Sequence, residues 1–469
     1  MEIIGRDSEK NEFDNILRSD KSEFVAVYGR RRVGKTFLIR EYLLKETIFH
    51  ITGIANVTTE IQLANFTTSL SKYNTAQKKI TPPVDWFEAF QQLIKHTEKS
   101  KLKRKVIFID ELPWLDTAKS NFIPALEHFW NSWAAARKDI VLVVCGSAAA
   151  WMINKLINNR GGLHNRVTSH IQLKPFTLKE CEAFFQHKNI IFNRYQIVQI
   201  YMCLGGIPYY LDLIKKGKST AQVINDLCFA SNGKLKNEFK NLYGSLFKKE
   251  ENYIKIVETL AAKNIGLNRE DIIKFSKLSN GGGTTRMLEE LEQSGFIRKY
   301  SGYGKSIRNS LYQLTDFFSM FYIKFMKKAS PSDTLFWLNS NDSAAYRNWA
   351  GYAFEKVCTY HIKEIKKAIG IAAVQTQTYA WQAKGAQIDL VIERRDGIIN
   401  IFEIKFSINE FLIDKKYDAV LRNKVGIFKQ VTNTKKAVHL VMISTYGIKQ
   451  NEYANTVLQN SITINQLFK

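Results

Sequence analysis

The segment from Gly29 to Thr36 constrains the fold of this chain more than any other part of its sequence. It reads Gly-Arg-Arg-Arg-Val-Gly-Lys-Thr, and it stands between an apolar run, 24–28, and a stretch with helical spacing of apolar residues, 37–44. A glycine-rich loop between a strand and a helix lets backbone amides surround phosphates, with the lysine on the β- and γ-phosphates and the threonine on Mg²⁺. The segment therefore predicts a P-loop that binds ATP, or a close relative of it, together with Mg²⁺. The expected nucleotide-binding residues are Gly29, Arg30, Arg31, Arg32, Val33, Gly34, Lys35, Thr36 and Phe37.

A second apolar run, 105–109, ends in two carboxylates, Asp110 and Glu111. A phosphate-binding loop of this kind needs an acid after a neighbouring strand to complete the magnesium shell. We therefore expect Asp110 to hold Mg²⁺ through water and Glu111 to polarise the water that attacks the γ-phosphate. The alternative is that the two acids cap the next helix, but Pro113 makes an immediate helix start less natural.

Two further residues are candidates for catalysis of hydrolysis. The apolar run 140–146 ends at Ser147, which would either contact the γ-phosphate or the attacking water, or cap a helix that starts at Ala148. Arg166 precedes a short strand-like segment, 171–175. It would act either as an arginine finger on a neighbouring subunit or as an ordinary surface arginine.

The middle of the chain has helical patterning. Segments 178–185 and 195–202 carry apolar residues three and four apart, which predicts a small helical lid over 177–245. Segments 253–262, 268–275 and 284–293 predict three helices, and 295–300 with 310–314 predict a hairpin, so residues 246–335 describe a winged helix.

A winged helix usually inserts its third helix into the major groove of DNA. The residues expected near DNA are Thr284, Thr285 and Arg286 at the start of that helix, and Arg298, Lys299, Lys305 and Arg308 beside the wing. The alternative is a winged helix used for packing or as a regulatory lid, because Glu289, Glu290 and Glu292 make the third helix partly acidic.

A new unit is expected over residues 340–469. An amphipathic helix, 349–362, carries Glu355, and two strands, 386–393 and 398–405, are joined by a two-residue turn at Asp396-Gly397. Such a hairpin brings Asp389 near Glu403, while Glu403 and Lys405 share a face. These groups are either surface charges or, because charges inside buried strands need a partner, a site for a metal.

Composition and charge set the wider frame. A chain of 469 residues exceeds the size of one hydrophobic core, so several domains are expected. The net charge of +24 favours nucleic acid as a partner, the alternative being a lysine-rich surface from AT-rich coding. Five scattered cysteines argue against disulfides and zinc. No apolar run long enough for a membrane and no secretion signal are visible, so a cytoplasmic protein without a membrane partner is expected.

Five segments occur in an order that resembles the archaeal-type AAA+/STAND ATPases. They are the opening 3–9 with Gly5 and Arg6, the P-loop, the Asp110-Glu111 strand end, the Gly146-Ser147 strand end, and Leu-Gly-Gly-Ile-Pro-Tyr-Tyr-Leu at 204–211. The resemblance implies that Gly5 and Arg6 lie by the adenine and that Pro208 closes over the nucleotide from the lid. Without the resemblance, Gly-Gly-Ile-Pro is merely a helix-breaking signal.

The acid at 389 and the Glu-x-Lys at 403–405, with Glu355 from a preceding helix, resemble the PD-(D/E)XK nuclease superfamily. The resemblance implies that Asp389, Glu403 and Lys405 are catalytic, and that Asp389, Glu403 and the accessory ligand Glu355 hold Mg²⁺ beside the scissile phosphate. The motif departs from the family pattern because no proline precedes Asp389. Lys415, Lys416 and Arg422 on the following helix would guide a phosphate backbone. The alternative is a degenerate nuclease fold kept for binding.

These expectations combine into an α/β chain with four parts. A P-loop AAA+ ATPase core over 1–176 is followed by a helical lid, a winged-helix domain and a C-terminal α/β restriction-endonuclease-like domain. The predicted function is an ATP-binding and ATP-hydrolysing protein that controls a Mg²⁺-dependent DNA endonuclease, serves defence or mobile-element functions, and forms a homo-oligomer when nucleotide is bound. The alternative is a STAND-like signalling switch, driven by ATP, whose nuclease-like domain only binds a partner.

Overall fold

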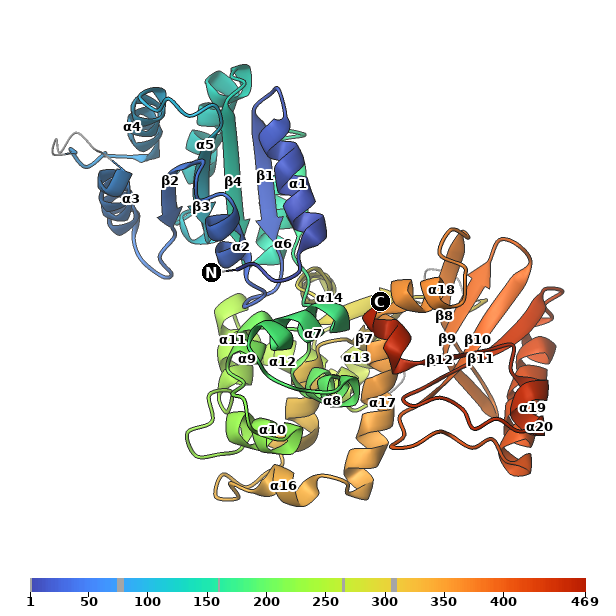
Figure 1. Ribbon diagram of the computed structural model, residues 1–469. Coiled ribbons are helices and arrows are strands. Elements are labelled where there is room, and N and C mark those ends of the chain that lie inside the picture. Colours follow the sequence, from blue (N-terminus) through green and yellow to red (C-terminus); the bar gives the residue numbers. More distant parts are fainter. Residues whose placement is uncertain (1, 74–79, 159–160, 264–265, 305–309) are drawn as a thin grey trace. The chain divides into compact units, whose positions relative to one another are not determined.

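The computed structural model describes residues 2–73, 80–158, 161–263, 266–304 and 310–469. The chain divides into two compact units, Met1–Pro175 and Phe176–Lys469 (Figure 1). The first unit ends one residue before the predicted end of the ATPase core. The second takes in all the segments predicted as lid, winged helix and nuclease-like domain. Among the described residues, no helix combines the length and the apolar character that crossing a membrane requires.

The first unit is built on a five-stranded sheet with the order β2-β3-β4-β1-β5, in which every neighbouring pair is parallel. The central strands are continuous apolar runs because helices cover both faces of a parallel sheet. One face packs against α3, α4 and α5, with Phe66, Phe90 and Phe129 in its core. The strands are β1 (Glu23–Tyr28), β2 (Thr47–Thr52), β3 (Lys105–Asp110), β4 (Ile140–Gly146) and β5 (Ser169–Gln172). The helices are α1 (Asp7–Arg18), α2 (Lys35–Tyr42), α3 (Thr59–Tyr73), α4 (Trp86–Glu98), α5 (Phe122–Ser132) and α6 (Ala149–Trp151).

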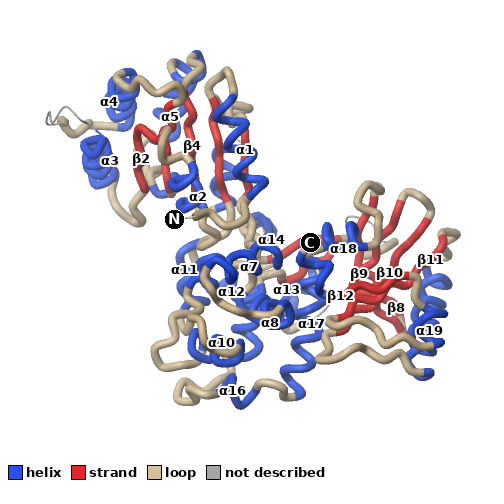
Figure 2. Tube along the Cα trace, viewed as in Figure 1, coloured by secondary structure: helices blue, strands red, loops and turns tan. Residues whose placement is uncertain are grey.

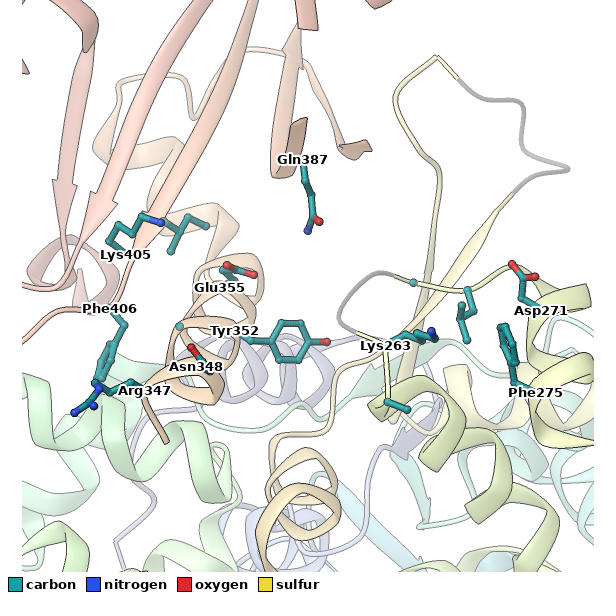
Figure 3. Close-up of a pocket in the computed structure, with 15 residues that line it drawn as sticks. Lys263, Asp271, Phe275, Arg347, Asn348, Tyr352, Glu355, Gln387, Lys405 and Phe406 are labelled. Carbon is teal, nitrogen blue, oxygen red and sulfur yellow. The ribbon is translucent and has the colours of Figure 1, made fainter. Parts of the chain in front are cut away.

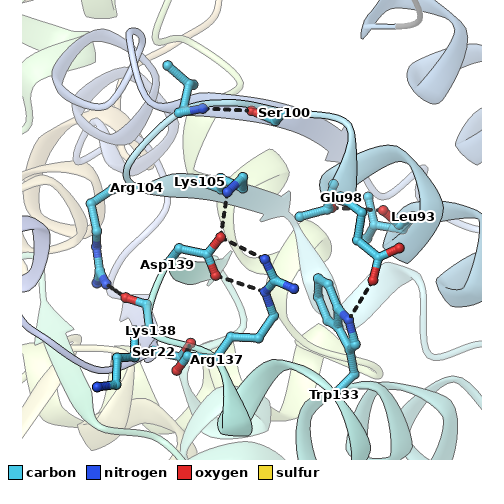
Figure 4. A network of polar contacts seen from close by, with 12 residues as sticks. Ser22, Leu93, Glu98, Ser100, Arg104, Lys105, Trp133, Arg137, Lys138 and Asp139 are labelled. Atoms are coloured by element: carbon cyan, nitrogen blue, oxygen red, sulfur yellow. Dashed lines mark hydrogen bonds and ion pairs between the residues drawn. The ribbon is translucent and has the colours of Figure 1, made fainter.

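A polar network fastens the amino ends of the central strands (Figure 4). Asp139, just before β4, accepts a hydrogen bond from Lys105 Nζ at the start of β3 and two of 2.8 Å from the Arg137 guanidinium. The arginine holds the pKa of the Asp139 carboxyl well below its usual range. Arg104 donates to the carbonyls of Lys138 and Ile16. The network lies at the strand ends opposite the P-loop, so it stabilises the sheet and does not contact the P-loop.

The second unit begins with helices and contains a three-helix segment followed by a hairpin. Its first helices are α7 (Leu178–His187), α8 (Arg194–Leu204), α9 (Pro208–Asp212), α10 (Thr220–Cys228) and α11 (Glu238–Leu246). The segment predicted as a winged helix contains α12 (Glu250–Ala261), α13 (Arg269–Ser276), α14 (Gly282–Gln293), β6 (Ile297–Tyr300) and β7 (Leu311–Leu314). The two strands pair in antiparallel fashion. The helices that follow are α15 (Phe317–Phe321), α16 (Phe336–Ser340), α17 (Ala344–Tyr360) and α18 (Ile362–Ala368).

The start of α14 is occupied by contacts within the protein. Thr284 is buried and its hydroxyl donates to the Ser279 carbonyl (2.8 Å), while Arg269 donates to Thr285 Oγ1 (3.0 Å). Arg286 is exposed and pairs with Glu290 at 2.9 Å. Thr284 and Thr285, two of the three residues expected near DNA, therefore make contacts that hold the fold together. The spacing of residues along one helix does not show such contacts with other segments.

The hairpin also differs from a free wing. The Tyr303 amide donates to the Ala380 carbonyl (2.9 Å), and Gly302 forms a bridge with Ala380, so the segment after β6 joins the edge of the second sheet. Arg298 donates to Gln313 on β7 and lies over the Tyr300 ring, and burial lowers its pKa. Arg298 is thus held by contacts within the hairpin, and its place beside DNA stays a prediction; Lys299 is exposed, and Lys305 and Arg308 lie outside the described residues.

The C-terminal part forms a second five-stranded sheet with the order β12-β11-β10-β9-β8, which Figure 2 shows in red beside the helices α17 and α19. β10 pairs in parallel with β11 and antiparallel with β9, so the sheet is mixed. Leu421 and Phe428 of α19 pack on Val391, Ile399 and Leu440 of one sheet face. The strands are β8 (Thr376–Ala383), β9 (Ala386–Arg394), β10 (Ile398–Lys405), β11 (Ala437–Ser444) and β12 (Asn460–Thr463). The helices are α19 (Lys415–Thr432) and α20 (Glu452–Val457), and a 3-10 helix, η6 (Ile464–Phe468), ends the chain.

The β9–β10 turn has three residues, 395–397, where the sequence predicted two. Ile399 pairs with Glu393 and Phe402 with Leu390, and continuing this register by one residue sets Glu403 opposite Asp389. A two-residue turn would have set Glu403 opposite Leu390. The extra residue is accommodated because Gly397 takes a left-handed conformation (φ 86°), as three-residue hairpin loops require.

A buried histidine joins the lid helix α7 to α17. The Leu178 amide donates to His361 Nε2 (2.9 Å), and Nδ1 donates to the Val357 carbonyl (2.8 Å), an arrangement that requires the neutral ring. Burial lowers the pKa of His361 to about 4. The histidine is neutral in the folded chain and titrates near 6.5 when unfolded.

We expect this histidine to make the second unit less stable in acid. Because its folded pKa is depressed, its contribution is complete above about pH 6.5 and is lost as the pH falls toward 4, to a total of about 3 kcal/mol. Urea unfolding of the wild type and of His361→Gln at several pH values isolates the effect, since other titrating groups are common to both. Equal pH slopes for the two proteins would contradict the prediction.

Candidate functional site: a phosphate-binding loop and a carboxylate-lysine cluster

The P-loop connects β1 to α2 and holds a lysine at its centre. Lys35 Nζ donates to the carbonyls of Gly29 and Arg30, both at 3.1 Å, and to Ser147 Oγ at 3.2 Å. Burial lowers the pKa of Lys35, and the nearby Glu111 and Asp110 act against that shift. The loop can close only with glycine at position 29, since an added Cβ would lie 2.3 Å from the Leu173 carbonyl oxygen. A cation is thus held where the loop amides would gather phosphates.

The predicted magnesium residues meet beside this lysine. Thr36 Oγ1 donates to Asp110 at 3.0 Å, and the Glu111 amide donates to Asp110 Oδ1 at 2.9 Å. The Cys145 thiol of β4 donates to the same oxygen at 2.6 Å, and burial, followed by Asp110, raises the pKa of that thiol. A hydroxyl and a carboxylate beside a phosphate cradle are oxygen donors of the kind that Mg²⁺ takes.

Glu111 and Ser147 contact each other instead of capping helices. Ser147 Oγ donates to Glu111 Oε1 (2.6 Å), and the Ser147 amide donates to Oε2 (3.2 Å). A 3-10 turn, η1 (Leu112–Trp114), follows Glu111 directly, but no side chain caps it. Helix α6 begins at Ala149, also without a side-chain cap. The capping alternative therefore does not hold for either residue.

Arg6 is hydrogen-bonded to the backbone of the P-loop. It is buried, in a left-handed conformation (φ 61°), and donates to the carbonyls of Lys174 (2.7 Å) and Val33 (3.0 Å). Gly5, beside it, also has a positive φ. Arg166 is exposed in a turn before β5, and Pro208 is the first residue of α9 in the second unit.

If Arg6 braces the loop, its loss should weaken the binding of every nucleoside triphosphate alike. We expect Arg6→Ala to lower ATP and GTP affinity by the same factor and to destabilise the first unit by about 2 kcal/mol, because two bonds from a buried charged group are removed. Calorimetric titration with both nucleotides measures this, with Lys10→Ala, on the helix that follows Arg6, as the control. A loss confined to ATP would instead indicate an adenine contact.

In the second unit, the predicted carboxylates and lysine lie together on β9 and β10. Glu403 is mostly buried; its Oε1 accepts from the Tyr417 hydroxyl (2.5 Å) and lies 3.0 Å from Lys405 Nζ. Its Oε2 accepts from Lys424 Nζ on α19. Burial raises the pKa of Glu403, but Lys424 and Lys405 lower it more, so the net shift is downward. For Lys405, Glu403 and Tyr417 outweigh burial and raise the pKa.

Two more groups complete the cluster. Asp389 Oδ1 accepts a 2.6 Å bond from the Gln387 amide on the same face of β9. Burial, and then the charge of Asp389, raise the pKa of Glu355 on α17 to about 8. A carboxyl that resists ionisation next to other carboxylates is a group that a cation would favour in its charged form.

A pocket of about 900 Å³ opens beside this cluster (Figure 3). Glu355, Gln387 and Lys405 line one side of it, and Lys263, Asp271 and Phe275 line the other, with Tyr352 between them. The site therefore has access to a cavity in the size range of ligand pockets, roughly 300–1,000 Å³.

The fit to a metal ion is partial. Across the described ranges, no three histidine, cysteine or acidic side chains lie close enough together to hold a metal ion, so Glu355, Asp389 and Glu403 do not form a ready-made cage. Mg²⁺ is usually bound by one or two carboxylates together with water and substrate phosphates. Asp389 and Glu403, on adjacent strands, could supply these two carboxylates.

Sequence reasoning missed several side chains of both sites. Tyr417 and Lys424 lie in the same helical stripe as the buried Leu421 and Phe428, so a lysine within an apolar stripe was the available signal. The role of Lys415, Lys416 and Arg422 in guiding a phosphate backbone stays a prediction: the two lysines are exposed, and Arg422 pairs with Asp418 at 2.8 Å. Cys145 gave no signal beyond its place near a strand end.

The parallel sheet, the loop after β1 and the lysine, threonine and acid gathered there define the class of P-loop ATPases. Residues 4–214 match the family model of an ATPase domain predominantly from Archaea, so the chain carries an archaeal-type P-loop ATPase domain.

Comparisons over longer stretches give more distant likenesses. Protein MJECL04 of Methanocaldococcus jannaschii is 25% identical over 404 residues, which are 83% of this chain and 84% of that protein. A Walker-type ATPase of Pyrococcus abyssi has 17% identity and a TM-score of 0.52 over 68% of this chain and 96% of its own. The ORC2 protein of Aeropyrum pernix, solved as ADPNP and ADP complexes, has 11% identity and a TM-score of 0.41 over 71% and 94%. The Pyrococcus likeness shows the fold alone.

Proposed function

We propose that this protein is an ATPase that controls a Mg²⁺-dependent DNA endonuclease in its own second unit. The observation that carries the proposal is the cluster on β9 and β10, where Glu403 lies opposite Asp389 and 3.0 Å from Lys405 Nζ. Its partner would be DNA, in keeping with the net charge of +24. We place the protein in the cytoplasm, without a membrane partner.

In the ATPase half, each residue near the loop has a proposed role. The P-loop amides and Lys35 would hold the phosphates, and Thr36 and Asp110 would hold Mg²⁺, which would offset the negative charge of the phosphates. Glu111 takes a proton from the attacking water, and Ser147, which touches both Glu111 and Lys35, orients it. Arg166 is exposed and acts on the nucleotide of a neighbouring copy in a nucleotide-bound oligomer.

In the nuclease half, Asp389 and Glu403 would hold the metal, which would supply charge stabilisation at the scissile phosphate. Lys405 orients the attacking water. Lys405 and Lys424 both contact Glu403, so these ammonium groups would have to move away from the carboxylate for it to serve as a metal ligand. Glu355 keeps its proton near neutral pH until a cation offsets the charge of Asp389.

Packing within the second unit supports a link between lid and nuclease cluster. Tyr195, at the start of lid helix α8, stacks on Phe406 with ring centroids 5.1 Å apart and planes 10° apart. Phe406 directly follows Lys405, and Tyr446 also stacks with Tyr195, with ring centroids 5.4 Å apart. A lid that moves with the nucleotide would therefore move the residue next to the catalytic lysine, which gives ATP a route to the site.

Cleavage assays with and without ATP test the proposal. Plasmid, linear duplex and single-stranded DNA are incubated with the full chain and Mg²⁺ or Mn²⁺, with ATP, with a non-hydrolysable analogue, or with no nucleotide. We expect metal-dependent cleavage that changes with nucleotide and disappears in Lys405→Ala. If no nucleic acid is cut under any of these conditions, the nuclease half of the proposal fails.

One observation favours a second function, a STAND-like signalling switch whose C-terminal domain only binds a partner. Glu403 is saturated by Lys405, Lys424 and Tyr417, which is a stable arrangement without any metal. A switch should hydrolyse ATP very slowly and increase in mass by light scattering when ATP is added. Rapid turnover together with cleavage would exclude it.

A further inference from the structure

The pocket beside the carboxylate cluster has an exposed aromatic ring at its far side. Phe275 of α13 is 49% exposed and lines the pocket. The ammonium groups of Lys263 and Lys274 lie 5.5 and 5.9 Å from the centre of its ring. Figure 3 shows Phe275, Lys263 and Asp271 on one side, facing Glu355 and Lys405 across Tyr352.

An aromatic ring of this size is usually buried, because burying it stabilises a fold by roughly 1.5–3 kcal/mol. Phe275 instead lines a cavity across from Lys405, with the ammonium groups of Lys263 and Lys274 over its ring, where they would move aside to contact phosphates when a base stacks. A ring flanked by lysines is the arrangement by which proteins hold unpaired nucleotides, with the base on the ring and the phosphates on the cations.

We propose that Phe275 is a stacking platform for an unpaired base, so that the pocket takes a single-stranded segment of DNA whose backbone passes Lys263 and Lys274 towards Lys405. The role of this platform in choosing a substrate for cleavage rests on the proposed nuclease function, but the binding of a single strand does not. The substrate would then be single-stranded, frayed or locally opened DNA, and an intact duplex would bind less well.

An unpaired base can stack on the ring more readily than a base within a duplex. The face of a paired base is covered by its neighbours in the stack and can reach a protein ring only after it is flipped out. Asp271 and Glu355 also line the pocket and would repel phosphates, so the backbone is expected along the lysine side.

Fluorescence anisotropy in EDTA tests the inference without cleavage. The probes are a labelled oligo(dT) strand and a blunt duplex of the same length, and the proteins are the full-length wild type, Phe275→Ala, Phe275→Trp and the control Ile191→Ala. Ile191 is an apolar residue 97% exposed elsewhere in the second unit, so it matches the loss of surface hydrophobic area.

We expect Phe275→Ala to weaken oligo(dT) binding about tenfold and duplex binding less than twofold, while Phe275→Trp retains the affinity for the strand. Lys263→Ala should lower the slope of log affinity against log salt concentration by the amount expected for about one phosphate contact. Phe275→Ala should leave this slope unchanged. Equal losses for both probes, or equal effects of Phe275→Ala and Ile191→Ala, would overturn the inference.

The outcome is separable from that of the nuclease proposal. Strand binding that depends on Phe275 without any cleavage would support the stacking platform and refute the nuclease proposal. Metal-dependent cleavage of duplex and strand at equal rates, unchanged in Phe275→Ala, would keep the nuclease and overturn the platform.

Discussion

Replacing Lys35 with alanine is expected to abolish ATP binding and to reduce ATP hydrolysis at least about a hundredfold. Lys35 is the buried cation at the centre of the loop, bonded to Gly29, Arg30 and Ser147, and no other side chain with a positive charge makes these three contacts in the described part of the chain. Groups of this kind stabilise the charge that develops on the transferred phosphoryl group, and removing one costs about 10²–10³ in rate. Calorimetric titration with ATP and a phosphate-release assay measure the two effects.

Two variants separate phosphate binding from general damage. Arg40 lies on the same helix as Lys35, is exposed, and among the ion pairs of the described residues contacts only its neighbour Glu41. The variant Arg40→Ala should therefore bind and hydrolyse ATP normally. Glu111→Gln should bind ATP with near wild-type affinity and still lose about 10²-fold or more of its turnover, because only the proton acceptor is changed. Normal ATP affinity in Lys35→Ala would refute the assignment of the loop.

Replacing Asp389 with asparagine is expected to remove metal-dependent DNA cleavage, with a loss of about 10²-fold or more. The substitution keeps the shape of the side chain and its contact with Gln387 on the same strand, but it removes the charge that would hold the cation between β9 and β10. Initial rates of plasmid nicking over a range of Mg²⁺ concentrations give the size of the loss.

The control for this variant is Glu393→Gln. Glu393 is on the same strand and pairs with Lys436 at 2.7 Å, so its loss changes the strand's charge equally without touching the cluster. ATP turnover in both variants reports whether the first unit is intact. If Asp389→Asn and Glu393→Gln cut DNA at the same rate as the wild type, the carboxylate cluster is not catalytic, and the second unit would have to act by binding.

The parts of this protein that could be predicted from sequence are those defined by short-range pattern. The loop at 29–36 carries its own chemistry, and the apolar runs ending at Asp110 and Gly146 are buried strands that converge on it. Glu111 and Ser147, residues 36 positions apart, were both expected beside the γ-phosphate; their direct contact was not predicted, although parallel strands place their carboxyl ends at one edge.

What could not be predicted depends on which segments pack against each other. Arg298 reads as a surface cation in a basic hairpin, yet the hairpin joins the edge of a second sheet through Tyr303. The resemblance places Arg6 beside the nucleotide, which stays a prediction, but no pattern in the sequence showed that its guanidinium donates to the Val33 carbonyl. The three-residue turn at 395–397 changes the register by one residue, and no local signal distinguished it from the two-residue form.

The boundary between the two units has a consequence for how such chains can be recombined. The matched ATPase sequence runs to residue 214, but the first compact unit ends at Pro175. Residues 176–214 therefore match the ATPase model yet pack within the second unit, where the Leu178 amide donates to His361 at the end of α17 and Tyr195 stacks on Phe406 just after β10. A gene fusion joined at residue 214 would separate these partners and expose their apolar surfaces. One joined at residue 175 would transfer both cores whole, so lid and C-terminal sheet are expected to be inherited as a pair.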